Sequence, residues 1–238
     1  MLHHHQFRSL LNSAFLFLAL LIPAMGQQDG AQPEEKKDQA KLRLICISSL
    51  EADQEVTLAS RNEKGEWLEL GKVGIRPSFI SDWLPAKPGE LHLTLPGNDG
   101  PKSICRFNYP ADARRALIVL IADPQKKVYR AGVFDPAKLK FAKGSVLAIN
   151  FSSRPGILVL GSKKVSLAAG GQSVIVPALE QNGMYRMLVA YEDADRKPVP
   201  CYDRYVQGNP DSRDLLFLIP EQSVGLKVFS LPIFGDMN

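Results

Sequence analysis

One strand-like segment occurs twice in the chain, and this repetition constrains the fold more than any other feature. RALIVLIAD (Arg115–Asp123) reappears 98 residues later as RDLLFLIPE (Arg213–Glu221). LRLICISS likewise matches VLAINFSS at an offset of 104, and a third pair of segments aligns Cys105 with Cys201. Because the order, spacing and character of these segments agree, we infer an internal duplication in which each copy spans about 95 residues.

The segments between the matched pairs are typical of β-structure. Short runs rich in β-branched and aromatic residues alternate with turn signals such as NEKG, AKPG and GNDG, and no run keeps a helical period over about eleven residues. The sequence therefore predicts an all-β protein of two tandem β-sandwich domains, immunoglobulin-like or cupredoxin-like, at residues 42–137 and 144–238. A single large sandwich or barrel is the alternative.

Alternation of apolar and polar residues predicts which side chains face the core. ALIVLIA is apolar on both faces, which predicts a central strand covered on both sides and intolerant of charge at Val119 or Leu120. In GELHLTL the leucines share one face, and His92 lies with Glu90 on the other, solvated face. In EWLEL the same rule turns Trp67 outward.

The first 26 residues, MLHHHQFRSLLNSAFLFLALLIPAMG, predict a secretory signal peptide cleaved before Gln27. The alternative, an uncleaved anchor, is disfavoured because the apolar run is shorter than the roughly 20 residues that span a bilayer. Residues 27–41 are polar and predict a flexible leader. We therefore expect a periplasmic or secreted protein with no membrane span after cleavage.

The charge pattern argues against a nucleic-acid partner. The formal net charge is +4, and basic pairs such as Lys126-Lys127 are interleaved with acidic residues rather than gathered into one field.

Histidine is scarce, which excludes several chemistries. Beyond the predicted signal peptide the chain has one histidine, His92, whereas an ordinary blue-copper site needs two. Cys-x-x-Cys pairs, P-loops and dinucleotide fingerprints do not occur. We therefore predict no metal site, cofactor or catalytic residue. The acidic stretch YEDADRK (Tyr191–Lys197) is a weak calcium candidate.

The three cysteines, Cys46, Cys105 and Cys201, lie in predicted strands of a chain expected to be exported. A bridge between Cys46 and Cys105 is a candidate disulfide, closing a loop worth roughly 4 kcal/mol. The alternative is three buried thiols that act as small apolar side chains.

Two tryptophans and the histidine are the candidate ligand contacts. Trp67 on an outer face and Trp83 in the loop SDWLPAKPG are suited to stack on a sugar ring or to anchor a partner protein. Trp83 has the alternative role of a core residue beneath its loop, and His92 that of a polar residue on a solvated strand face.

The second copy, VLAINFSSRPGILVLGSKKVSLAAGGQSVIVP, has a strand ending in Asn-x-Ser, a short hairpin and an L-x-x-G turn. It resembles uncharacterised tandem β-sandwich modules of bacterial envelopes. The resemblance covers about 90 residues of the second copy well and the first copy loosely, and it implies a fold and a compartment only.

These observations favour an exported, non-enzymatic binding protein of the cell envelope. The favoured mode is strand addition at an exposed sheet edge, with an envelope protein as the partner. The alternative is polysaccharide binding through Trp67. A remote alternative is hydrolysis through His92, although no G-x-S-x-G nucleophile motif is present.

Overall fold

The computed structural model describes residues 39–221 and 225–235, so the predicted signal peptide and nearly all of the predicted leader lie outside the described residues. The described residues contain no helix and 17 strands, which confirms the all-β class. The first half contains β1 (Lys41–Ser48), β2 (Gln54–Arg61), β3 (Trp67–Ile75), β4 (Phe79–Ile80), β5 (Leu84–Pro85), β6 (Gly89–Leu95), β7 (Lys102–Tyr109), β8 (Arg115–Asp123) and β9 (Val128–Phe134). The second half contains β10 (Val146–Asn150), β11 (Gly156–Leu160), β12 (Lys163–Leu167), β13 (Gln172–Ile175), β14 (Met184–Glu192), β15 (Pro198–Gln207), β16 (Arg213–Glu221) and β17 (Gly225–Ile233).

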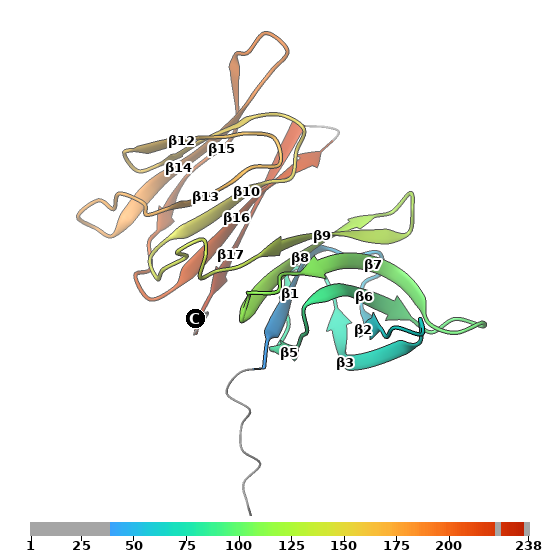
Figure 1. Ribbon diagram of the computed structural model, residues 1–238. Helices are drawn as coiled ribbons and strands as arrows, with labels where there is room; N and C mark the ends of the chain where they lie inside the picture. The colour runs from blue at the N-terminus through green and yellow to red at the C-terminus, as the bar shows by residue number, and fades with distance from the viewer. Residues whose placement is uncertain (1–38, 222–224, 236–238) are drawn as a thin grey trace, which may run out of the picture. The chain divides into compact units, whose positions relative to one another are not determined.

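Each half contains two sheets, and the strand orders correspond. The outer sheets have the orders β3-β2-β6-β7 and β12-β11-β14-β15. The inner sheets have the orders β4-β1-β8-β9, with β5 also paired to β1, and β13-β10-β16-β17. In both inner sheets the first strand of the half pairs in parallel with its last strand but one, and that strand forms a hairpin with the final strand, as Figure 1 shows for β8–β9 and β16–β17.

The outer sheets also share an irregularity at the same place. In β7 the pairing skips Ile104, between Leu93↔Cys105 and Thr94↔Ser103. In β15 it skips Cys201, between Val189↔Tyr202 and Ala190↔Pro200. Such β-bulges add one unpaired residue to an edge strand. The residue that corresponds to Cys201 is therefore Ile104, one position before the Cys105 that sequence comparison aligns with it.

Three apolar clusters lie on the sheets. The first cluster joins the two sheets of the first half, and the third cluster joins those of the second half. The second cluster is made of the remaining faces of the two inner sheets, with members such as Val119 and Phe217. The described part of the chain accordingly belongs to one compact unit, Lys37–Asn238.

The strand β8 is buried on both faces, as its sequence predicts. Ala116, Ile118 and Leu120 belong to the first cluster, whereas Leu117 and Val119 belong to the second. All five are 0% exposed. A period-2 strand that is apolar at every position fits only between two packed layers, so the double-sided core position of ALIVLIA is confirmed.

The connection between the halves lies between Phe134, where β9 ends, and Val146, where β10 begins. Phe141 in this segment is 1% exposed and packs in the second cluster. The buried Arg213 donates from Nε to the Phe141 carbonyl at 2.7 Å. The connection is thus held by its own buried side chain and by a charged hydrogen bond.

Candidate functional site

Trp67, at the start of β3, is covered by neighbouring side chains. The Arg61 guanidinium lies 4.3 Å from the centre of the indole ring, because the two residues are paired across β2 and β3. The His92 ring meets Trp67 edge-on, with centroids 5.0 Å apart. A cation–π contact of this kind stabilises by about 1 kcal/mol, so a sugar stacking on that face would have to displace Arg61.

His92 is buried rather than solvated, which corrects the prediction from alternation. It is 7% exposed, and Thr94 on the same face is 2% exposed. Alternation correctly places His92 and the leucines on opposite faces of β6, but Trp67 packs over the face that carries His92. The prediction fails because the period of a strand says which side a residue faces and not what covers that side.

Both ring nitrogens of His92 have partners. Nδ1 lies 2.9 Å from the Ser103 hydroxyl, and Nε2 lies 3.0 Å from Oε1 of Glu90. Carboxylate, imidazole and hydroxyl in series have the connectivity of a nucleophilic triad, with the two ring nitrogens exchanged relative to the serine-protease arrangement. Ser103 was missed from sequence, because it reaches His92 only through the pairing of β6 with β7.

Trp83 packs against the second cluster. Its ring lies 4.7 Å from the Arg43 guanidinium and 5.3 Å from that of Arg115. Burial lowers the pKa of Arg43, while the nearby charge of Asp82 opposes this effect. Trp83 therefore acts as a partly buried residue between two cations, and Trp67, Trp83 and His92 do not come together as one surface.

Cys46, Cys105 and Cys201 are free thiols in the structure. Cys46 and Cys105 belong to the first cluster, and burial raises the pKa of each to about 12. Burial also raises the pKa of the half-buried Cys201. A thiol with a raised pKa is a poor nucleophile at neutral pH, so these side chains serve packing in this state.

The acidic loop proposed for calcium is organised by its own backbone. The Asp193 carboxylate accepts hydrogen bonds from the backbone of Asp195 and of Lys197, at 2.9 and 2.8 Å. This is ordinary Asx-turn chemistry. Among the described residues, no group of three or more His, Cys, Asp or Glu side chains is placed to hold a metal ion.

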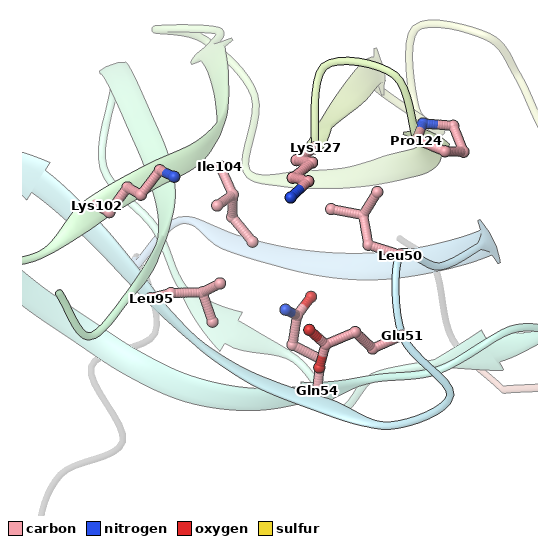
Figure 2. Close-up of a pocket in the computed structure, with 8 residues that line it drawn as sticks. All are labelled: Leu50, Glu51, Gln54, Leu95, Lys102, Ile104, Pro124 and Lys127. Atoms are coloured by element: carbon pink, nitrogen blue, oxygen red, sulfur yellow. The ribbon is translucent and has the colours of Figure 1, made fainter.

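A pocket of about 350 Å³ opens at one end of the first half, where three connections meet (Figure 2). The β1–β2 connection and the start of β2 form one wall, the β6–β7 turn region forms a second, and the β8–β9 hairpin forms the third. The lining residues are Leu50, Glu51, Gln54, Leu95, Lys102, Ile104, Pro124 and Lys127.

A hydrogen-bond chain orients one polar group of this pocket. The Tyr129 hydroxyl accepts from the backbone N–H of Leu50 at 3.0 Å and donates to Oε1 of Gln54 at 3.2 Å. Because a phenol has a single proton, this donation fixes the Gln54 oxygen toward Tyr129. The NH₂ of Gln54 is thereby left for the pocket, into which Figure 2 shows the side chain extending.

At the corresponding end of the second half, among the described residues, a buried amide joins the loops. Asn150 occupies the position of Cys46, as the pairings Asn150↔Leu218 and Cys46↔Leu120 show. Asn150 is 0% exposed. Its Nδ2 contacts the carbonyls of Arg154, Leu167 and Ala168 at 2.7, 3.4 and 3.1 Å, and its Oδ1 accepts from the N–H and hydroxyl of Ser152.

Tyr191 packs between Arg154 and Gly225 at the same end. The Arg154 guanidinium lies 5.4 Å from its ring centre, and a Cβ added to Gly225 would lie 2.7 Å from the ring. Gly225 has a φ of +79°, so both its backbone conformation and the close approach of Tyr191 require glycine.

Comparison with known proteins does not identify the chain. No protein-family model matches it, and no curated protein matches it significantly in sequence. No helix in the described residues is long and apolar enough to cross a bilayer.

Proposed function

We propose that the chain is an exported, non-enzymatic binding protein, made of two tandem β-sandwich domains that arose by duplication. The observation that carries the proposal is the pocket of about 350 Å³ in the first half. Ligand sites in proteins are concave, mostly apolar and equipped with a few oriented polar groups. The apolar wall and the oriented Gln54 amide have this character.

The duplication is supported by more than the sequence repeats. The strand orders correspond in both pairs of sheets, and the unpaired residues Ile104 and Cys201 fall at corresponding places. Export is supported by residues 1–26 alone. N-terminal sequencing of the protein recovered from outside the cytoplasm tests the predicted signal peptide. A protein that is exported but still begins at Met1 would contradict cleavage.

Ligand-observed NMR with a fragment library of mixed charge tests the binding function. Leu95 lines the pocket at the end of β6, so Leu95→Trp should fill it and abolish the fragment signals that depend on it. Leu179→Trp, at an exposed leucine of the second half, is the matched control. Absence of any fragment that binds the wild type and loses binding in Leu95→Trp would contradict the proposal.

Strand addition is a second candidate, favoured by β15. This ten-residue strand is the edge of its sheet, and Tyr205 on it is 59% exposed. Pro198 and Pro200 lack an N–H group, so an added strand would pair beyond them. Photo-crosslinking from Tyr205 in the producing cells should capture an envelope protein, whereas crosslinking from Lys164 on β12 should not.

Hydrolysis is a third candidate because Ser103, His92 and Glu90 lie in series. A fluorophosphonate probe tests it, since an activated serine forms a covalent adduct with such probes. Labelling that is lost in Ser103→Ala and in His92→Ala would favour an enzyme. We expect no labelling, because Nδ1 rather than Nε2 faces Ser103 and the ring is 7% exposed.

A further inference from the structure

The pocket of the first half brings together hydrogen-bond donors from both of its sheets. Lys102 begins β7 of the outer sheet, and Lys127 lies in the β8–β9 hairpin of the inner sheet. Figure 2 shows both ammonium groups turned toward the pocket, with Lys127 above Gln54. With the Gln54 oxygen held by Tyr129, three donor groups face one space.

The charges of these two lysines are not held in ion pairs within the described part of the chain. Lys102 and Lys127 form no ion pair with any residue in the described ranges, although other lysines do, such as Lys138 with Asp112 at 2.6 Å. One carboxylate, that of Glu51, lines the same pocket. The lining charge is therefore about one positive unit, which favours a monoanion over a doubly charged anion such as phosphate.

The backbone at Lys127 is held in an unfavourable conformation. Its φ is +53°, a left-handed value that glycine or asparagine adopts at lower cost. Arg196, in the β14–β15 turn, has a similar φ of +61°, so this conformation belongs to the hairpin turn and serves here only to choose the asparagine substitution used below.

The remaining lining is apolar. Leu50, Leu95 and Pro124 supply most of the rest of the wall, and the largely buried Ile104 adds its edge. A ligand that only offered charge would leave this surface in contact with water. The volume of about 350 Å³ lies near the lower end of the range for small-molecule sites.

We propose, on the basis of the binding function above, that the pocket takes a small amphipathic carboxylate. Its carboxylate accepts hydrogen bonds from Lys102, Lys127 and the Gln54 amide, and its apolar body lies against Leu95 and Ile104. The partner is thus a free monocarboxylic acid with a short alkyl or aryl body.

Three probes with the same body and different head groups test the proposal. Binding of octanoate, 1-octanol and octylamine to the full exported chain is measured by titration calorimetry and by ligand-observed NMR. Octanoate should bind, octanol should bind about tenfold more weakly, and octylamine should bind weakest. Raising the salt concentration should weaken the binding of octanoate and leave the binding of octanol unchanged.

The variants Lys102→Gln and Lys127→Asn separate charge from folding. Each should lower octanoate affinity about fivefold, and the pair about tenfold or more, with octanol unaffected. Lys127→Asn suits the left-handed backbone, so it removes the charge without weakening the fold. Lys163→Gln and Lys164→Asn on β12 of the second half make the same charge change away from the pocket and should have no effect.

Three outcomes would overturn the inference. They are octanol binding as tightly as octanoate, octanoate affinity unchanged in the double lysine variant, and no binding of octanoate at all. If cationic or neutral fragments bind instead, and lose binding in Leu95→Trp, the binding function is supported but the carboxylate ligand is contradicted. Binding only of peptides through their carboxyl terminus would likewise replace the free acid with a protein partner.

Discussion

The corresponding ends of the two halves differ although their strands follow the same order. In the first half the Cys46 thiol donates to the Ser48 carbonyl at the end of its own strand, at 3.3 Å. In the second half Asn150 at the same position ties two loops together, and Tyr191 packs against Gly225. The comparison teaches that the same strand order can place either a pocket or a hydrogen-bonded amide among the loops at this end.

The largest expected effect is the loss of stability when a charge is placed at matching core positions of the two halves. Leu120 and Leu218 occupy matching inner-sheet positions and are both 0% exposed. Leu120→Asp and Leu218→Asp should each cost about 5 kcal/mol or more, because a carboxylate would be buried without a partner. That cost rivals the whole stability of a domain.

Circular dichroism and the soluble yield measure these two variants. Leu68→Asp, at a leucine that is 43% exposed, should stay within about 0.5 kcal/mol of the wild type. A folded Leu218→Asp beside an unfolded Leu120→Asp would show that the two cores are not equivalent.

Alkaline pH should affect the first half more. Burial raises the pKa of Cys46, Cys105 and Tyr109 in the first half to about 12, and that of Tyr185 in the second. Each group has a higher pKa in the folded state than in the unfolded state. Its contribution to the free energy of unfolding is therefore complete below the unfolded-state pKa and is lost as the pH rises toward 12.

At pH 10.5 each thiol should cost about 2 kcal/mol of the free energy of unfolding. Urea unfolding at pH 8 and 10.5, followed by tryptophan fluorescence, measures this loss, since both tryptophans lie in the first half. Replacing Cys46 and Cys105 by alanine should flatten the pH dependence while lowering the starting stability. An unchanged slope in that double variant would refute the assignment to the thiols.

The buried amide of Asn150 should contribute more to the free energy of unfolding than the thiol of Cys46 at the corresponding position. Asn150→Ala should cost about 2–3 kcal/mol, because it removes the donor to the carbonyls of Arg154 and Leu167 and the acceptor of the Ser152 backbone N–H. Cys46→Ala should cost about 1–2 kcal/mol, since only packing is lost. Equal costs in urea unfolding would mean that the hydrogen bonds of Asn150 do not stabilise the second half.

The smallest effect concerns two left-handed residues. Lys127 in the β8–β9 hairpin and Arg196 between β14 and β15 have φ values of +53° and +61°. Lys127→Asn and Arg196→Asn should each stabilise by about 0.5 kcal/mol, because asparagine tolerates this backbone better. Thermal unfolding measures both, and only the change at Lys127 should alter octanoate binding.

Strand positions could be predicted from sequence because period-2 patterns and turn residues are local signals. The doubly covered strand β8 is the clearest case, with Val119 and Leu120 facing different clusters. The alignment of Cys105 with Cys201 was wrong by one residue, because a β-bulge changes the spacing without a mark in the sequence.

The contents of the sites could not be predicted in the same way. His92 lies between Glu90 and Ser103 because β6 pairs with β7 in one particular register. The pocket is lined by residues from several separate segments of the chain, and no short motif joins Gln54 to Lys127. Tertiary placement of loops carries this information, and a single sequence does not display it.

The second cluster has a consequence for how the protein is made. During synthesis the first half emerges before β10 and β16 have been made to cover Leu117 and Val119. During that interval the nascent chain exposes a hydrophobic surface, which chaperones bind and which promotes aggregation. A polypeptide cut between residues 134 and 146 would keep this surface permanently, so the two fragments should be produced together rather than one at a time.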